Sequence, residues 1–209
     1  MFHVEQQFSQ FTPLPHFNLK KSTTKHLTIM EKEKIEFVKS KVRNIPDFPV
    51  KGIQFKDLTT AFKDAESLRI MCDAITELYT GKGITKVVGI EARGFIFGAI
   101  LAERLGAGFV PLRKPGKLPA RTIKKTYTKE YGEDTIEIHE DSINENDVVL
   151  MHDDLLATGG TMAAALELVK TMNPAKIYVN FICELEDLGG RKLFPQDVEV
   201  TSLFAFKGE

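Results

Sequence analysis

Apolar and polar positions along the chain form two kinds of block, which alternate. Short, nearly continuous apolar runs, typical of strands buried on both faces, occur at residues 86–90, 109–112, 147–151 and 177–183. Longer segments with apolar residues spaced to line one face of a helix occur at residues 35–42, 64–79, 95–105 and 161–172. Because strand, helix and strand follow one another at this spacing, the pattern predicts βαβ units and a mostly parallel sheet with helices on both faces.

Residues that begin or end helices stand at the boundaries of these segments. Asp64 can accept a hydrogen bond from an N–H group of the first turn, so it is the expected N-cap of the helix that follows it. Gly106 is expected to end the helix before it. Ile45 precedes Pro46, and a residue before proline is disfavoured in the helical conformation, so the first helix must end before this point.

Composition points to a single domain and restricts its partners. The 209 residues carry a net charge of −1, which gives no global attraction to nucleic acid or anionic membranes. No apolar run approaches the roughly 18 residues of a membrane span. Cys72 and Cys183 lie far apart among apolar neighbours, which favours buried thiols in a reducing compartment. We therefore expect one cytoplasmic domain over residues 31–209, with neither nucleic acid nor a membrane as partner.

Residues 1–30 differ from the rest of the chain. They contain one acid, Glu5, no arginine and no sustained hydrophobic period. A charged, helix-forming run begins at Met30, which is a natural start for the protein. We interpret residues 1–30 as an extension that is disordered or has no function, and a targeting segment or a contact with a partner is the alternative.

The apolar run at residues 147–151 leads into two carboxylates and a glycine-rich loop. The sequence here is VVLMHDDLLATGGTM, so the strand is expected to deliver Asp153 and Asp154 to the carboxyl edge of the sheet, where ligands bind. The loop enters a helix N-terminus, which favours an anion through its N–H groups and dipole. Gly159 and Gly160 permit close approach of the backbone to an anion, and Thr158 and Thr161 can donate hydrogen bonds to it.

Together these groups favour a sugar phosphate as ligand. The loop can hold the phosphate, while the carboxylates accept hydrogen bonds from hydroxyl groups or bind a cation. The loop lacks the lysine of a Walker motif, and its glycines are spaced differently from those of a dinucleotide site. A glycine-rich turn with capping hydroxyl groups and two solvated acids is the alternative without a ligand.

A basic block forms a second candidate region. No acid lies between Glu103 and Glu130, and the part of this interval from residue 113 onward contains seven basic residues: Arg113, Lys114, Lys117, Arg121, Lys124, Lys125 and Lys129. Two prolines and a glycine interrupt the block, which predicts a flexible lid at about residues 114–134 that closes over an anionic ligand. A solvated charged face is the plain alternative. Nucleic acid is disfavoured because Tyr127 is the only aromatic residue of the block.

Several separate segments resemble the type I phosphoribosyltransferases. The stretch DDLLATGGT at 153–161 is similar to the motif with which that family binds 5-phosphoribosyl 1-pyrophosphate (PRPP), in the form of its adenine-specific members. The likeness covers about residues 35–206 and continues through IPDFPVKGIQFKDLT (45–59), GIEARGFIFG (89–98), PLRKPGKLPA (111–120), YTKEYG (127–132) and CELEDLGGRKL (183–193). The resemblance implies the α/β fold of the family, with a central, mostly parallel sheet flanked by helices, a small N-terminal hood at about residues 45–60, and the lid.

The resemblance also implies a reaction. An enzyme of this kind takes part in purine salvage and transfers the phosphoribosyl group of PRPP to adenine, giving AMP and pyrophosphate, with Mg²⁺ bound mainly through PRPP oxygens. A homodimer is implied, and the apolar helix at 95–105 is a candidate for the subunit contact. Two alternatives stay open, namely transfer to another purine base and a non-catalytic PRPP-sensing regulator. The regulator is disfavoured because residues 1–30 show no helix-turn-helix pattern.

Roles for individual residues follow from the resemblance. Glu130 is implied as the group that handles the proton of the purine ring, and Arg93 as a catalytic cation at the leaving pyrophosphate. PRPP and AMP would be bound by Ala92, Arg113, Lys114, Lys117, Tyr131, Asp153, Asp154, Ala157, Thr158, Gly159, Gly160 and Thr161. Adenine would be bound by Ile53, Phe55 and Lys56, with the Phe55 ring stacked on the base.

Three of these assignments have alternatives. Arg93 can instead form an ion pair with Glu91 or Glu103, and Phe55 can pack in the core. Lys56 stands where many relatives carry arginine, so a bidentate role of its side chain does not carry over.

Two further features near the expected site are open. The Ala92–Arg93 bond is a candidate for the cis peptide that relatives have before this arginine. His152 stands where relatives commonly have an apolar residue, and it either packs beneath the strand end or modifies the charge of Asp153.

Overall fold

The centre of the molecule is a parallel sheet. The computed structural model describes residues 24–47, 51, 54–129 and 132–207. Within them, one sheet has five strands in the order β4-β3-β7-β8-β9, and every neighbouring pair is parallel. The strands are β3 (Lys86–Ile90), β4 (Gly108–Leu112), β7 (Val148–Leu156), β8 (Lys176–Leu185) and β9 (Glu199–Phe206). The predicted α/β fold with a mostly parallel sheet is confirmed.

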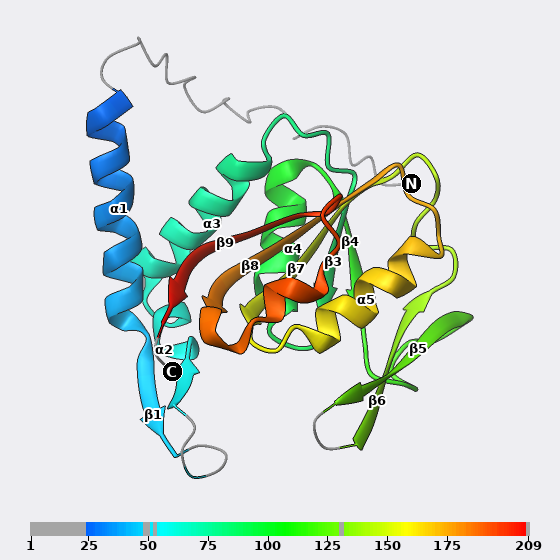
Figure 1. Cartoon of the computed structure of the whole chain (residues 1–209). Coiled ribbons are helices and arrows are strands. Elements are labelled where there is room, and N and C mark those ends of the chain that lie inside the picture. The colour runs from blue at the N-terminus through cyan, green and yellow to red at the C-terminus, as the bar shows by residue number, and fades with distance from the viewer. Residues whose placement is uncertain (1–23, 48–50, 52–53, 130–131, 208–209) are drawn as a thin grey trace, which may run out of the picture.

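Helices cover both faces of this sheet (Figure 1). On one face lie α1 (Thr24–Lys41), α2 (Thr59–Phe62), α3 (Ala65–Tyr79) and α4 (Gly94–Leu105). On the other face lies α5 (Gly160–Lys170). Two short 3-10 helices, η1 (Glu186–Leu188) and η2 (Gly190–Leu193), follow β8. No helix in the described part of the chain has the length and apolar character that crossing a membrane requires.

The sheet separates two apolar cores. Successive side chains of a strand point to opposite faces, so Leu150 of β7 packs in the core beneath α3 and α4, and Met151 in the core beneath α5. Both side chains are fully buried. Because each strand is covered on both faces, its sequence is nearly continuously apolar, which is why the short apolar runs predicted strands correctly.

Two small antiparallel sheets stand at the carboxyl-end side of the large sheet (Figure 1). β1 (Arg43–Pro46) pairs with β2 (Gln54–Asp57) in the segment where the hood is expected. β5 (Thr122–Lys129) pairs with β6 (Gly132–His139), and an isolated bridge between Arg113 and Glu137 joins this hairpin to the chain that leaves β4. The region predicted as a lid loop thus contains strands, which the sequence hides because TIKKTYTK does not alternate cleanly between apolar and polar residues.

Several predicted boundaries agree with the structure. β3 spans the predicted residues 86–90. Asp64 caps α3, since its Oδ1 atom accepts a hydrogen bond from the Ser67 N–H group at 2.9 Å. Gly106 ends α4 in the left-handed conformation, with φ of 66°. These caps could be predicted from sequence because each depends on only a few residues next to it along the chain.

Other boundaries differ from the prediction. β7 continues to Leu156 instead of ending at Met151, because its pairing with β8 extends to Leu156 opposite Glu184. The edge strand β9 adds a fifth strand to the predicted four. α1 begins at Thr24, inside the segment interpreted as an extension.

Candidate active site

The ends of three neighbouring strands bring many of the predicted residues to one edge. β3 leads into the turn at residues 91–94, β4 into Arg113, and β7 into the loop at residues 157–159. β3 lies between β4 and β7, so the three ends are adjacent. This is the edge at which parallel α/β sheets bind their ligands.

Arg93 contacts the second of the two acids. Its Nε atom lies 2.8 Å from Oδ2 of Asp154, whose side chain is 1% exposed, whereas the arginine side chain is 39% exposed. Within the described residues this carboxylate oxygen has no well-aligned hydrogen-bond donor, so the contact is mainly one of charge. The alternative in which Arg93 pairs with Glu91 or Glu103 is not the arrangement found, because the arginine lies over the end of β7.

The turn before Arg93 contains a cis peptide bond between Glu91 and Ala92. The expectation that Ala92–Arg93 is the cis bond is therefore wrong by one residue. Arg93 already has helical backbone angles, with φ of −74° and ψ of −28°, so the turn is complete at Ala92 and α4 begins directly afterwards.

Gly94 permits the start of α4 to lie directly on β7. A Cβ atom at this position would be 2.7 Å from the carbonyl oxygen of His152 and 3.2 Å from Oδ1 of Asp153. Any side chain would therefore push the helix away from the strand. The glycine of the EARG motif thus holds Arg93 beside the acids, a positioning role that was not assigned from sequence.

Burial raises the pKa of both acids. The pKa of Asp153 lies well above the usual range because the side chain is desolvated and the charge of Asp154 is adjacent. Burial also raises the pKa of Asp154, while Arg93 opposes that shift. Oδ1 of Asp153 accepts a hydrogen bond from the N–H group of Asp154 at 2.9 Å. A strand end that holds this much negative charge out of water is suited to a ligand with hydroxyl groups or a cation.

The loop after β7 has the geometry of an anion cradle. Gly159 precedes α5 with φ of 81°, a left-handed conformation that favours glycine, and Thr161 lies in the first turn of the helix. The loop packs against the start of η2, because a Cβ atom at Gly159 would be 2.7 Å from the carbonyl oxygen of Gly190. A Cβ atom at Gly190 would in turn clash with the carbonyl oxygen of Ala157. Gly190 therefore supports the predicted phosphate loop, although its sequence motif gave it no such role.

A pair of charged residues links the turn of Arg93 to the basic block. Arg113 contacts Glu91 through Nη2 at 3.0 Å and Nε at 3.2 Å, and Glu91 also accepts a hydrogen bond from the N–H group of Lys114 at 2.9 Å. The guanidinium of Arg113 and this N–H group hold the pKa of Glu91 below its usual range. Arg113 also donates to the carbonyl oxygen of Lys117 at 3.2 Å. The Nζ atom of Lys114 forms an ion pair with Asp134.

Glu137 anchors the base of the lid region from a buried position. Its side chain is 1% exposed and accepts hydrogen bonds from the N–H groups of Lys117 and Leu118, both at 3.2 Å. Lys124 contributes an ion pair at 3.3 Å. Burial alone would raise the pKa of Glu137, but these donors outweigh it and the pKa is lowered. No sequence motif indicated this carboxylate, because its partners come together only when the loop folds back onto β6.

The hood strand β2 carries two of the residues predicted to bind adenine. Phe55 is half-buried and lies opposite Ile45 in the register of β1 and β2. Lys56 lies over the ring of Phe206, with Nζ 4.7 Å from the centroid. Phe206 is the last residue of β9, so this contact holds the hood against the carboxyl edge of the sheet.

Three predicted residues, Ile53, Glu130 and Tyr131, lie outside the described residues. Their roles stay predictions.

His152 belongs to a buried polar network. Its Nδ1 atom lies 2.9 Å from Oδ1 of Asn180, whose Nδ2 atom donates to Thr201 at 2.9 Å, and Tyr79 reaches the same threonine at 2.8 Å. Burial lowers the pKa of the imidazole to about 4, with Asn180 opposing the shift, so the ring is neutral near pH 7. The ring lies 6.0 Å from that of Phe97 in α4. Strand alternation turns it to the face opposite Asp153, so packing beneath the strand end is the correct alternative.

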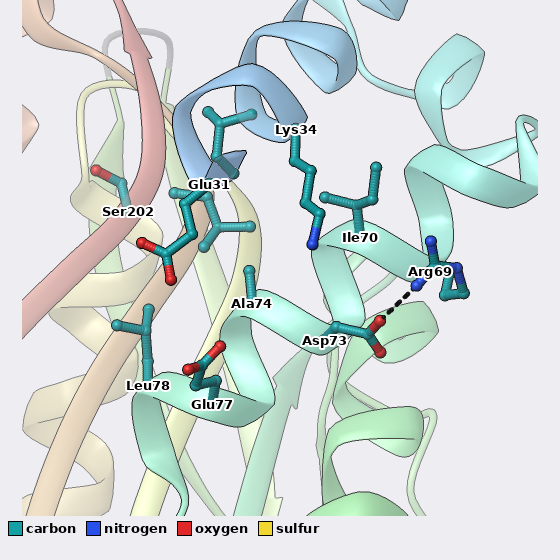
Figure 2. Close-up of a pocket in the computed structure, with 11 residues that line it drawn as sticks. Glu31, Lys34, Arg69, Ile70, Asp73, Ala74, Glu77, Leu78 and Ser202 are labelled. Atoms are coloured by element: carbon teal, nitrogen blue, oxygen red, sulfur yellow. Dashed lines mark hydrogen bonds and ion pairs between the residues drawn. The ribbon is translucent and has the colours of Figure 1, made fainter. Parts of the chain in front are cut away.

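A groove of about 410 Å³ lies elsewhere, between α1, α3 and β9 (Figure 2). Its wall combines apolar side chains such as Ile70 and Leu78 with charged ones such as Lys34, Asp73 and Glu77. None of the predicted site residues lines it. The strand-end cluster, rather than this groove, carries the charge and backbone geometry that a sugar phosphate requires.

Comparison with known proteins gives a consistent result. A family model described as "Phosphoribosyl transferase domain" matches residues 61–202. The chain is 61% identical to the adenine phosphoribosyltransferase of Bacteroides fragilis over 179 residues, which cover 85% of this chain and 99% of that protein. It is 55% identical to the adenine phosphoribosyltransferase of Citrifermentans bemidjiense, with 82% and 100% covered.

Solved structures agree. The crystal structure of adenine phosphoribosyltransferase from Rhodothermus marinus matches with a TM-score of 0.79 at 47% identity, covering 84% of this chain and 99% of that one. The enzyme from Saccharomyces cerevisiae, solved with a bisphosphate imino-altritol and adenine, matches with a TM-score of 0.77 at 39% identity, covering 82% and 99%. Because the domain model spans more than half of the chain and the curated relatives are matched over nearly their whole length, the chain belongs to the adenine phosphoribosyltransferase family.

Proposed function

We propose that this chain transfers the phosphoribosyl group of PRPP to adenine, releasing pyrophosphate and AMP in purine salvage. The observation that carries the proposal is the end of β7, where the buried Asp154 and the partly buried Asp153, both with raised pKa values, stand beside Arg93 and lead directly into a phosphate-type loop. One strand end therefore offers acceptors for ribose hydroxyl groups and donors for a phosphate. The names of the relatives supply the identity of the base.

The ribose and its 5-phosphate are assigned to the two parts of this strand end. Asp153 and Asp154 accept hydrogen bonds from the ribose hydroxyl groups. These neutral donors replace the hydrogen bonds to water that the carboxylates lose on desolvation. The loop from Ala157 to Thr161 binds the 5-phosphate through backbone N–H groups, through the Thr158 and Thr161 hydroxyl groups, and through the dipole of α5. A crystal structure of the Trypanosoma brucei enzyme with AMP, pyrophosphate and ribose-5-phosphate supports these ligand classes.

Departure of pyrophosphate requires positive charge at the same edge. In the proposed reaction N9 of adenine bonds to C1 of the ribose, the bond from C1 to the pyrophosphate oxygen breaks, and N9 loses its proton. Arg93, Ala92 of the adjacent turn, Arg113, Lys114 and Lys117 are the groups assigned to the leaving anion. Arg113 and Lys114 are already fixed by Glu91 and Asp134, so they are oriented before the substrate arrives.

Magnesium fits this site as an ion shared with the substrate. The described residues contain no cluster of three or more His, Cys, Asp or Glu side chains that could hold a metal ion by themselves. Mg²⁺ commonly keeps several waters and is bound by one or two carboxylates together with substrate phosphates, for which Asp153 and the PRPP oxygens are suitable. When bound, the ion supplies charge that neutralises pyrophosphate.

The base is assigned to the hood and to the residues that follow β5 in the sequence. Phe55 stacks on adenine, and the main chain at Ile53 and Lys56 reads its edge. Glu130 handles the proton at the purine ring, and Tyr131 binds PRPP or AMP. The support for Ile53, Glu130 and Tyr131 is the sequence resemblance alone.

Two properties of the whole protein belong to the same proposal. A homodimer is supported by exposed apolar side chains on neighbouring elements, Ile96 of α4 at 44% and Phe109 of β4 at 36%. A cytoplasmic location is supported by two buried cysteines that form no disulfide.

AMP formation from adenine, PRPP and Mg²⁺ tests the proposal, with hypoxanthine, guanine and xanthine as parallel substrates. We expect turnover with adenine and at least about 100-fold lower kcat/KM with the other bases. A base with a different hydrogen-bonding edge would leave buried polar groups of the site unpaired. Preference for another base would overturn the assignment around Phe55 and leave the PRPP site in place. PRPP binding without turnover on any base would favour a sensor.

A further inference from the structure

The hairpin of β5 and β6 is docked on the predicted phosphate loop through one tyrosine. The hydroxyl oxygen of Tyr127 lies 2.9 Å from Oγ1 of Thr161, in the first turn of α5. The tyrosine is half-buried, and its ring packs against the apolar core on the α5 side of the sheet. Tyr127 of β5 therefore contacts a residue at the predicted phosphate loop, although the reaction proposed above gives this tyrosine no role.

Two ion pairs hold the hairpin in the same place. Lys125 of β5 reaches Glu167 of α5 at 2.7 Å. Lys125 and Tyr127 are two positions apart on one strand, so both point toward α5. Asp134, which lies opposite Tyr127 in the register, forms an ion pair with Lys114. The tyrosine is therefore located between the phosphate loop and a lysine assigned to pyrophosphate.

The protons available decide which of Tyr127 and Thr161 donates the hydrogen bond between them. A phenol has one proton, so among its hydrogen-bond partners in the described part of the chain Tyr127 can donate either to Thr161 or to Oδ2 of Asp134, which lies 3.3 Å away. The threonine contact is the shorter and lies in the usual range for an O–H···O bond. A phosphate has no proton to give and must receive that of Thr161, which leaves the oxygen of Thr161 as the acceptor for Tyr127.

We propose that Tyr127 is a positioning residue that donates to Thr161 and thereby aims the threonine proton at the ligand phosphate. This inference rests on the proposed function, since it assumes that the loop binds the 5-phosphate. Tyr127 touches neither the substrate nor the reacting atoms and acts through Thr161. Binding of the phosphate and the seating of the hairpin are then coupled through a single hydrogen-bonded chain.

The test compares Tyr127→Phe with the wild type and with Thr126→Val. Thr126 is the matched control, because it lies one residue away on the opposite side of β5 and pairs with Thr135 at 2.9 Å. Calorimetry with ribose 5-phosphate, and steady-state kinetics with PRPP and adenine, are the measurements. We expect Tyr127→Phe to raise the Kd for ribose 5-phosphate and the KM for PRPP about two- to tenfold, the effect of one hydrogen bond. The KM for adenine should stay within about twofold, and Thr126→Val should match the wild type.

A double-mutant cycle decides whether the tyrosine acts through the threonine. In a Thr161→Val background the Phe substitution should have no further effect on the binding of ribose 5-phosphate. Equal effects of Tyr127→Phe in both backgrounds, or an unchanged Kd for ribose 5-phosphate in Tyr127→Phe, would overturn the inference. A wild type that binds neither ribose 5-phosphate nor PRPP would instead show that the proposed function itself is wrong, and the inference with it.

Discussion

The folded protein disfavours the ionised forms of Asp153 and Asp154. Desolvation raises the pKa of each, and this shift is opposed by the partly exposed Arg93 and by the N–H group of Asp154. Two adjacent acids in such surroundings cost stability. The cost is expected at a site where a ligand later supplies the missing donors.

Substitution of Asp153 by asparagine should therefore stabilise the protein while weakening its function. The pKa of Asp153 is raised in the fold, so its ionisation removes stability as the pH rises above the ordinary value near 3.8. We expect Asp153→Asn to be about 1–2 kcal/mol more stable than the wild type at pH 7, and this advantage should shrink toward pH 4. The KM for PRPP should rise about 10- to 100-fold, since a charged acceptor is lost.

Chemical unfolding at several pH values, with initial rates at pH 7, measures both effects. Asp197→Asn is the control, because that carboxylate is 76% exposed and should change stability by less than about 0.5 kcal/mol. A stability advantage of Asp153→Asn that grows as the pH falls would contradict the assignment of a raised pKa.

At the scale of elements, function depends on how closely backbones approach. α4 can start on β7 only because residue 94 is glycine, and the loop between β7 and α5 lies on η2 only because residues 159 and 190 are glycines. These contacts join the turn of Arg93, the phosphate loop and the segment after β8. Backbone positions, rather than long side chains, therefore set the shape of the predicted cradle.

Gly159→Ala and Gly160→Ala form a matched pair that tests this view. Residue 159 has φ of 81° and a Cβ atom there would be 2.7 Å from the carbonyl oxygen of Gly190, whereas a Cβ atom at residue 160 has nothing within 4 Å. We expect Gly159→Ala to lose about 1–3 kcal/mol of unfolding free energy, from backbone strain together with the clash. Gly160→Ala should keep the stability of the wild type.

Thermal unfolding of the two variants gives the comparison, and binding of ribose 5-phosphate reports on the loop. Equal stability of the two variants would mean that the loop can move away from η2 without loss.

On the scale of the whole molecule, a buried network ties the centre of the sheet together. His152 of β7, Asn180 of β8, Thr201 of β9 and Tyr79 of α3 form one chain of hydrogen bonds. Because these residues come from four elements, the network exists only when the sheet and its helical cover are both assembled. It should therefore contribute to the cooperative unfolding of the protein.

The histidine in this network predicts acid sensitivity. Its pKa is lowered from 6.5 to about 4, so the unfolded chain binds a proton between those values and the folded protein does not. Stability is thus present above about pH 6.5 and is lost as the pH falls toward 4, by about 3 kcal/mol in total. His152→Leu should remove this part of the pH dependence, whatever its own stability at pH 7.

Denaturant unfolding of both proteins between pH 4 and 7 measures the difference in slope. His139→Leu is a suitable control, because that histidine is not fully buried and contacts the carbonyl oxygen of Pro119 at the edge of the hairpin. Parallel pH profiles of His152→Leu and the wild type would rule out the lowered pKa.

Many elements of the central fold could be predicted from sequence, and the reason is that each depends on local patterns. Buried strands such as β3 are continuous apolar runs, and α3 and α4 carry their own caps. The hairpin of β5 and β6 could not be predicted, because its lysines and threonines are fixed by α5 and by Glu137 rather than by periodicity.

By itself the sequence determined the alternation of β3, β4, β7 and β8 with helices, and the motif at residues 153–161 that is similar to that of the family. It also predicted the carboxyl edge of the sheet as the site. Only the tertiary structure decided which side chains pair there. Arg93 pairs with Asp154, Arg113 with Glu91, and Tyr127 with Thr161. Such pairs join residues far apart along the chain, and their choice depends on packing distances between elements, which no local pattern of apolar and polar residues encodes.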